Sequence, residues 1–224
     1  MSRIRDRWGD LGVRVTSAFV MFLIGLAALL ISKWTFFALA CLIVVVGVWE
    51  LVCMARATSA VGGIGQSDVL WLVAYGILLC VGALGLIGLR FAFGISGVAM
   101  IIALVVVTDT LGYFVGRALG GAKFWPRISP KKTWAGILGG WAGAAILALI
   151  VAPLMDLKIA LWVAVIGAMA LSFASQMGDI FESALKRRMG VKDSSNLIPG
   201  HGGVLDRFDA LIAVGALVFL MGLM

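Results

Sequence analysis

The residues best suited to chemistry lie in one segment near the C-terminal end of the sequence, from Lys186 to Asp209. Its glycines let backbone N–H groups approach phosphate oxygens closely, and its lysines and arginines neutralise phosphate charge. Its aspartates are hard oxygen ligands that suit Mg²⁺, an ion that commonly bridges carboxylates and substrate phosphates. The segment therefore predicts a polyphosphate site with bound magnesium. Its candidate residues are Lys186, Arg187, Lys192, Asp193, His201, Gly202, Gly203, Asp206, Arg207 and Asp209.

Other common catalytic arrangements are missing from the sequence. It has no Walker A pattern, no Ser-His-Asp or Cys-His arrangement and no set of zinc ligands. His201 is the only histidine. A single histidine is often structural, but within a charged, glycine-rich segment we favour phosphate contact or proton handling. The three cysteines, Cys41, Cys53 and Cys80, lie in apolar runs and are interpreted as small buried hydrophobic residues.

A polar stripe precedes the basic segment. Its members are spaced by three, four or seven residues around Asp179, and this spacing places them on one face of a helix. They are Ser172, Ser175, Gln176, Asp179, Ser183 and Lys186, with Glu182 beside them. A polar face inside a bundle lines either a water-filled path or a site for a polar ligand. A transporter therefore stays an alternative at this point.

Asp109 is a carboxylate within an apolar run, roughly 12 Å of helix before Arg117. A carboxylate at such a depth costs about 2.5–3.5 kcal/mol, so a partner or a function must offset it. Helical spacing places Asp109, Gly112, Tyr113 and Gly116 on one face. We interpret Asp109 as a substrate-binding candidate. The simpler alternative is a packing face with one acid directed to lipid or water.

A second basic segment runs from Ser129 to Trp134 and contains Lys131 and Lys132. It has the same phosphate-binding chemistry as the first segment. Taken alone, it fits equally well an ordinary basic loop with a tryptophan at the membrane interface.

These residues must be positioned by membrane helices. The sequence has 224 residues, 62% of them hydrophobic and only 13% charged, with a mean hydropathy of +1.12. This composition excludes a cytosolic globular protein, a disordered chain and a secreted disulfide scaffold. It predicts an all-α, polytopic transmembrane helix bundle with about seven spans. The first apolar run has no convincing cleavage site, so we expect an anchor there rather than a secretory signal. The expected spans are about 15–31, 34–54, 69–89, 91–116, 134–153, 159–178 and 205–224.

The distribution of charge predicts the orientation. With the N-terminus inside and the C-terminus outside, 15 of the 18 lysines and arginines fall in cytoplasmic segments, and only Lys33, Arg90 and Lys158 lie outside. The cytoplasmic loops are then 117–133 and 179–209. The net charge of +7 is explained by this topology, which argues against a nucleic-acid partner. We expect N-terminal transmembrane helices over 1–107 and a catalytic transmembrane region over 108–224.

The residues from Ser183 to Asp209 resemble the C-terminal signature of the phosphatidate cytidylyltransferase (CDP-diacylglycerol synthase) family. Three further family features occur in order: Asp109-Thr110-x-Gly112-Tyr113-x-x-Gly116, Ser129-Pro130-Lys131-Lys132-Thr133-Trp134-x-Gly136 and Gln176-x-Gly178-Asp179-x-x-Glu182-Ser183. The resemblance covers about residues 108–209. The chain departs from the family at Ala135, where a glutamate is common. It is also shorter than many members, chiefly on the N-terminal side.

The resemblance implies transfer of CMP from CTP to phosphatidic acid at the cytoplasmic face of the membrane, and the compactness of the chain favours a bacterial inner membrane. It implies Asp179 and Asp206 as the main metal ligands and Asp209 as a further one. The ions would be Mg²⁺ and a second, monovalent ion such as K⁺, and the family also suggests a homodimer. The implied catalytic residues are Asp179, Asp206, Lys186, Arg207 and His201. The implied substrate-binding residues are Ser129, Lys131, Lys132, Ser183, Arg187, Lys192, Asp193, Gly202, Gly203 and Asp109.

The residues themselves leave two alternative functions open. A CTP-dependent lipid kinase, or a cytidylyltransferase for a different lipid, could use the same basic segments. A transporter could use the stripes around Asp109 and Asp179 as an ion path, but it would leave the segment from His201 to Arg207 unexplained.

Overall fold

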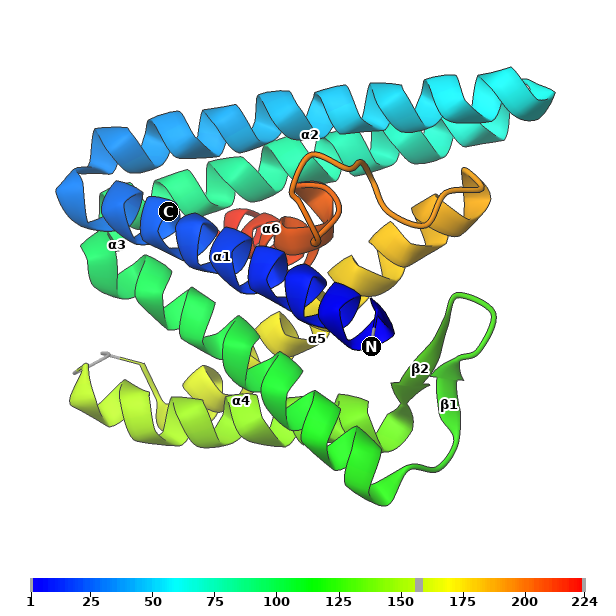
Figure 1. The fold of residues 1–224 in the computed structure, drawn as a ribbon. Coiled ribbons are helices and arrows are strands. Elements are labelled where there is room, and N and C mark those ends of the chain that lie inside the picture. Colours follow the sequence, from blue (N-terminus) through cyan, green and yellow to red (C-terminus); the bar gives the residue numbers. More distant parts are fainter. Residues whose placement is uncertain (1, 156–158, 223–224) are drawn as a thin grey trace.

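The apolar runs of the sequence form long helices, and the computed structural model describes residues 2–155 and 159–222 (Figure 1). Within an apolar run the backbone N–H and C=O groups satisfy one another best in a helix, which explains this outcome. The elements are α1 (Ser2–Ile31), α2 (Lys33–Gly62), α3 (Gln66–Leu119), β1 (Lys123–Trp125), β2 (Ser129–Thr133), α4 (Trp134–Leu154), α5 (Leu161–Arg188) and α6 (Leu205–Leu220). The predicted all-α membrane bundle is confirmed, with one small β-hairpin added to it.

Helix α3 contains two of the predicted spans. Gly94 has φ 67° and ψ −151°, a backbone conformation that interrupts the helix and that favours glycine. The 54 residues of α3 would extend about 80 Å if they were straight, far more than the roughly 30 Å of a bilayer core. The kink therefore divides α3 into two arms, which correspond to the predicted runs 69–89 and 91–116.

Five described helices are long and apolar enough to cross a membrane: α1, α2, α3, α4 and α5, with α3 counted once despite its kink. Helix α6 is apolar but has only 16 residues. The number of seven spans and the inside orientation of the N-terminus stay predictions. Lys158, which we expect in an outer loop, and the last two residues of the run 205–224 lie outside the described residues.

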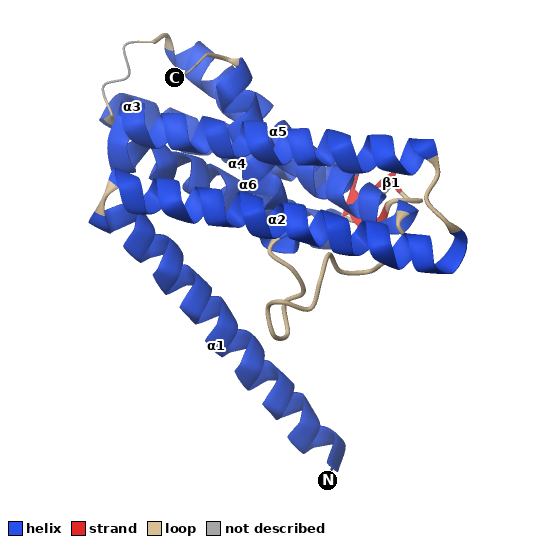
Figure 2. Cartoon of the chain, turned by 90° about the horizontal axis from the view of Figure 1, so that it is seen from above, coloured by secondary structure: helices blue, strands red, loops and turns tan. Residues whose placement is uncertain are grey.

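Helix α6 packs against both α3 and α5, and α4 also packs against these two helices. Small residues allow the closest approach: a Cβ at Gly82 of α3 would lie 2.8 Å from Ile212 Cγ2 of α6. Helix α2 packs along α3. Helix α1 contacts α2 and diverges from the rest of the bundle toward its N-terminal end (Figure 2).

The segments predicted to be cytoplasmic meet at one end of the bundle. The β1–β2 hairpin lies near the C-terminal half of α5, at the right of Figure 1. The two strands pair antiparallel, with Lys123 opposite Thr133. Helix α5 also continues ten residues beyond the predicted end of its span, to Arg188, so that the connection to α6 spans only residues 189–204.

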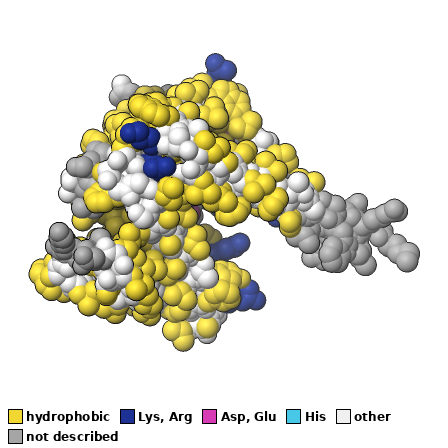
Figure 3. Space-filling view, turned by 90° about the vertical axis from the view of Figure 1, so that its left-hand side faces the viewer, with side chains coloured by type: hydrophobic (Ala, Val, Ile, Leu, Met, Phe, Trp, Pro, Cys, Tyr) yellow, Lys and Arg dark blue, Asp and Glu magenta, His cyan; other side chains and the backbone are white. Residues whose placement is uncertain are grey.

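Hydrophobic side chains cover the flanks of the helices, as Figure 3 shows for one face. Large exposed examples are Phe22, Val45, Leu70, Ile150 and Trp162, from five different helices. A water-soluble protein rarely exposes so much apolar surface, whereas a bilayer would cover it.

Candidate active site

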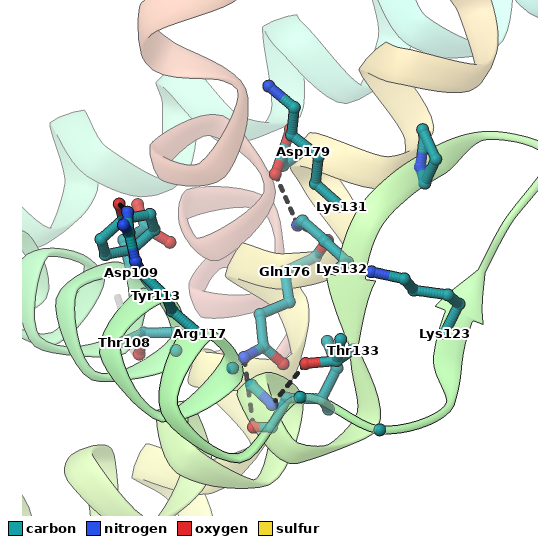
Figure 4. A pocket seen from close by; sticks show the side chains of 17 residues that line it. Thr108, Asp109, Tyr113, Arg117, Lys123, Lys131, Lys132, Thr133, Gln176 and Asp179 are labelled. Atoms are coloured by element: carbon teal, nitrogen blue, oxygen red, sulfur yellow. Dashed lines mark hydrogen bonds and ion pairs between the residues drawn. The ribbon is translucent and has the colours of Figure 1, made fainter.

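A cavity of about 640 Å³ opens between the second arm of α3, the β-hairpin, α4 and α5 (Figure 4). Its lining includes the whole face predicted from helical spacing around Asp109, and both lysines of the second basic segment. The lining residues are Thr108, Asp109, Gly112, Tyr113, Gly116, Arg117, Gly120, Gly121, Lys123, Pro130, Lys131, Lys132, Thr133, Gly136, Ile137, Gln176 and Asp179. The cavity thus combines a cationic rim with polar groups on the helices.

Glycines explain how α3 and α4 come close enough to form this cavity. A Cβ at Gly136 would lie 2.7 Å from the carbonyl oxygen of Gly112, so any larger residue would push the two helices apart. Thr133 ends the hairpin and begins α4, because its Oγ1 accepts a hydrogen bond from the N–H of Gly136 at 3.2 Å. The hairpin is therefore held in a fixed direction over the cavity.

Polar groups on the inner side of the cavity are bound to one another. Gln176 Nε2 donates to the carbonyl of Ile137 at 3.2 Å, and Trp141 Nε1 donates to Gln176 Oε1 at 3.1 Å. Next to them, Thr108 Oγ1 donates to Ser172 Oγ at 2.9 Å. These bonds fix the polar stripe of α5 against α3 and α4, so the stripe faces the protein interior as predicted.

Lys132 connects the hairpin to α5 at one side of the cavity. Its Nζ lies 2.5 Å from Asp179 Oδ2 and donates to the carbonyl of Gln176 at 3.2 Å (Figure 4). Lys131 also lines the cavity and is exposed, as is Asp109. Ser129 lies half-buried at the start of β2 and pairs with Trp125.

Three carboxylates gather beside the cavity. Asp179 and Glu182 of α5 and Asp209 of α6 each place a carboxylate oxygen within 4.8 Å of the others, and Asp179 also lines the cavity. Glu182 Oε2 forms an ion pair with Lys186 Nζ at 2.7 Å. In the described part of the chain, the other oxygen of Glu182 is buried and has no hydrogen-bond partner. A buried carboxylate oxygen without a partner is costly, and a bound cation would satisfy it.

Asp206 occupies a different environment. Its Oδ1 lies 2.5 Å from Lys186 Nζ. Its Oδ2 accepts hydrogen bonds from the N–H of Ser194 (3.0 Å), Ser194 Oγ (3.0 Å) and the N–H of Gly203 (2.7 Å). Both oxygens of Asp206 therefore hold the 189–204 loop and α5 together. A Cβ at Gly202 would lie 2.6 Å from Asp206 Oδ2, so the loop needs a glycine there.

The remaining candidates lie around the loop. Arg207 is exposed and donates to the carbonyl of His201 through Nε (3.1 Å) and Nη2 (2.6 Å). His201 Nδ1 lies 2.8 Å from Ser17 Oγ of α1. In the described part of the chain, neither Arg207 nor His201 lines the cavity. Four more candidates are also separate from the lining: Ser183 is half-buried on α5, and Arg187, Lys192 and Asp193 are exposed.

Two acidic residues were not predicted in these positions. Glu182 lies three residues after Asp179 and was placed beside the polar stripe, but it was not counted among the metal ligands. Glu50 is fully buried in α2 and accepts a hydrogen bond from the N–H of Val204, at the end of the 189–204 loop. Like Asp109, it is a carboxylate inside an apolar run, which is a signal that the sequence already contains.

Comparison with known proteins identifies the family of the chain. The model of the family described as "Cytidylyltransferase family" matches residues 65–224, a longer stretch than the motifs alone suggested. The chain is 49% identical over 130 residues to the phosphatidate cytidylyltransferase of Brucella abortus biovar 1 (strain 9-941), covering 58% of this chain and 48% of that protein. It is 39% identical over 142 residues to the protein of the same name from Staphylococcus saprophyticus, covering 60% of this chain and 55% of that protein.

The chain spans about half the length of the curated relatives that it matches. The family match, however, includes the second arm of α3, the hairpin, α5, the 189–204 loop and α6, and so contains every residue of the cavity and of the acidic cluster. Since this match takes in well over half of the residues, the chain belongs to the cytidylyltransferase family.

Proposed function

We propose that this chain transfers CMP from CTP to phosphatidic acid, forming CDP-diacylglycerol and pyrophosphate. The observation that carries the proposal is the position of Asp179, which joins a basic cavity to a three-carboxylate cluster at one end of an apolar helix bundle. A basic cavity suits the phosphates of a nucleotide, and its volume of about 640 Å³ falls in the usual range for small-molecule sites. The names of the relatives support the same reaction.

The lipid substrate accounts for the apolar surroundings of the site. Phosphatidic acid has an anionic headgroup and two acyl chains, so its headgroup can reach the hairpin end of the bundle while its chains stay beside the helices. Lys131 and Lys132 line the cavity and are the first candidates to neutralise phosphate charge. Arg187, Lys192 and Arg207, with Ser129, Ser183, Asp193, Gly202 and Gly203, are proposed as further substrate contacts.

Asp179, Glu182 and Asp209 are the residues that would hold a divalent cation, which we propose to be Mg²⁺. The fit rests on the proximity of their oxygens and on the buried, unpartnered oxygen of Glu182. When bound, such an ion supplies charge neutralisation for the phosphates and alignment of the attacking and leaving oxygens. Asp206 would contribute through Lys186 and the loop, and direct binding of a metal, or of a second monovalent ion, by Asp206 stays a prediction.

The reaction itself needs no nucleophile from the protein. An oxygen of the lipid phosphate forms a bond to the α-phosphorus of CTP, and the bond from that phosphorus to the bridging oxygen breaks. Pyrophosphate leaves with the bonding electrons. The contribution of the protein is positioning and charge neutralisation, which are the main components of catalysis in phosphoryl transfer. Lys132 is suited to this role because it sits between the cavity and the carboxylates.

The location of the active site and the oligomeric state are further parts of the same proposal. The concentration of lysines and arginines at the hairpin end favours an active site on the cytoplasmic side of the bacterial inner membrane. A homodimer is an expectation that comes from the family.

Product analysis tests the function. The detergent-purified protein is incubated with labelled CTP, phosphatidic acid and Mg²⁺, with and without EDTA. We expect CDP-diacylglycerol and pyrophosphate, and only when free Mg²⁺ is present. Release of CDP with a phosphorylated lipid would replace the proposal with a lipid kinase. A folded protein that turns over no nucleotide with any lipid acceptor would refute both, and solute flux in liposomes would then favour the transporter.

A further inference from the structure

Glu50 of α2 is buried to 0% exposure and accepts four hydrogen bonds from the segment that leads into α6. Two come from hydroxyls: Ser195 Oγ at 2.6 Å and Ser194 Oγ at 3.0 Å. Two come from the backbone N–H groups of Val204 and Leu205, both at 2.8 Å. Glu50 lies before residue 65, outside the region that matches the family model.

The two backbone bonds place Glu50 at the N-terminus of α6. Val204 and Leu205 are the last residue before α6 and its first residue, where N–H groups have no partner within the helix. A carboxylate at this point satisfies them and interacts favourably with the helix dipole. Val204, the residue before α6, provides no side-chain cap of its own. The carboxylate of α2 therefore fixes where α6 begins, and Asp209 follows within the next turn.

The hydroxyl bonds extend the same network to the acidic cluster. Ser194 Oγ lies 3.0 Å from Glu50 Oε2 and also 3.0 Å from Asp206 Oδ2. Asp206 in turn binds Lys186, and Lys186 binds Glu182 of the cluster. A continuous chain of polar contacts thus runs from α2 through the loop to α5. A Cβ at Gly203 would collide with both Ser194 Oγ and the Glu50 carboxylate, so the loop sequence matches this contact.

We propose that Glu50 is a positioning residue that sets the 189–204 loop and the start of α6, and so places Asp209 and Asp206 relative to the carboxylates of α5. Glu50 does not line the cavity, so it acts through these residues and not on the substrate. Its expected effect on turnover rests on the proposed cytidylyltransferase function. Its expected effect on the loop does not.

The test compares Glu50→Gln with Leu89→Ala. The glutamine keeps the shape of the side chain but offers one acceptor oxygen in place of two, so a backbone N–H of α6 loses its partner. We expect amide hydrogen exchange over residues 193–206 to become at least about tenfold faster, while exchange in α4 stays unchanged. We also expect the Mg²⁺ concentration for half-maximal turnover to rise about 10–100-fold, the usual effect of losing a residue that supports metal ligands. Leu89 is buried in a different part of the core, so its variant should lower thermal stability without either change.

The two readouts separate the possible failures. Faster loop exchange in Glu50→Gln, in a protein that makes no CDP-diacylglycerol, would refute the function and keep the positioning role. Wild-type loop exchange and wild-type Mg²⁺ dependence in an active Glu50→Gln protein would refute the positioning role and keep the function. If Glu50→Gln does not fold, the positioning role is tested instead with Ser194→Ala and Ser195→Ala, because each removes one hydroxyl of the network. Unchanged loop exchange in both serine variants would overturn the proposal.

Discussion

Lys186 offers the sharpest test of the electrostatics of this site. Its Nζ lies 2.7 Å from Glu182 Oε2 and 2.5 Å from Asp206 Oδ1, so a single cation serves two carboxylates. The three side chains are only 15%, 3% and 6% exposed, respectively, and water therefore screens them little. The variant Lys186→Met keeps the apolar stem of the lysine and removes only its charge.

We expect Lys186→Met to lower the free energy of unfolding by about 3–5 kcal/mol, because removing one partner leaves buried charge uncompensated. Arg188→Ala is the matched control, two residues further along α5. Arg188 forms an ion pair with Asp68 at 2.7 Å, but these side chains are 36% and 19% exposed. Solvent-exposed pairs contribute at most about 1 kcal/mol, and Arg188 also donates to Ser67 and lies over the ring of Trp71, so the control should lose more than such a pair but less than Lys186→Met.

A second variant tests the cause of the loss. Adding Glu182→Gln to Lys186→Met replaces one of the two acids that have lost their cation, while Asp206 still accepts hydrogen bonds from Ser194 and Gly203. We therefore expect the double variant to be more stable than the single one. The assay is SDS titration in mixed micelles, followed by circular dichroism, without divalent cations. The reasoning is refuted if Lys186→Met unfolds within about 1 kcal/mol of the wild type, or if the double variant is the weaker of the two.

Three further outcomes follow from the site and the fold. Glu182→Gln should raise the Mg²⁺ concentration for half-maximal turnover by at least about tenfold, and an unchanged requirement would remove it from the proposed metal site. Gly136→Val should cost about 1–3 kcal/mol or more in unfolding free energy by forcing α4 away from α3, whereas Gly167→Val, which meets no atom within 4 Å, should cost less. A cysteine at Arg127 of the hairpin should react with an impermeant thiol reagent only from the cytoplasmic side, and one at Lys33 only from the outer side, in a background without native cysteines. Labelling of both from one side would contradict the predicted orientation.

Much of the fold could be predicted because apolar runs and helices coincide in a membrane protein. The runs 34–54 and 134–153 lie within α2 and α4, respectively. The position of the kink in α3 could not be predicted, since the charge at Arg90 suggested a break that the backbone makes at Gly94. The hairpin was also missed. Strands of three and five residues are too short, and too rich in basic residues, to show an alternating pattern.

Which site residues lie side by side could be predicted only within a single helix. Helical spacing placed Asp109 and Gly116 on one face, and both line the cavity. Asp206 and Asp209 lie three residues apart on α6, so spacing alone could not show which of them joins the carboxylates of α5. The packing of α6 brings Asp209 into the carboxylate cluster and directs Asp206 to the loop. Such choices depend on how helices pack, which spacing within one helix does not encode.

The contact between Glu50 and the loop has a consequence for how the protein is made. Glu50 precedes Ser194 by 144 residues, so a ribosome delivers its carboxylate to the membrane long before its donors exist. Until α6 follows, that carboxylate lies in an apolar helix without these partners, at a cost below the roughly 2.5–3.5 kcal/mol of a charge at the centre of a span. We therefore expect that insertion of α6 and its preceding loop removes this cost, because it supplies the donors to Glu50. Insertion of α6 therefore satisfies Glu50 and sets the 189–204 loop in the same step.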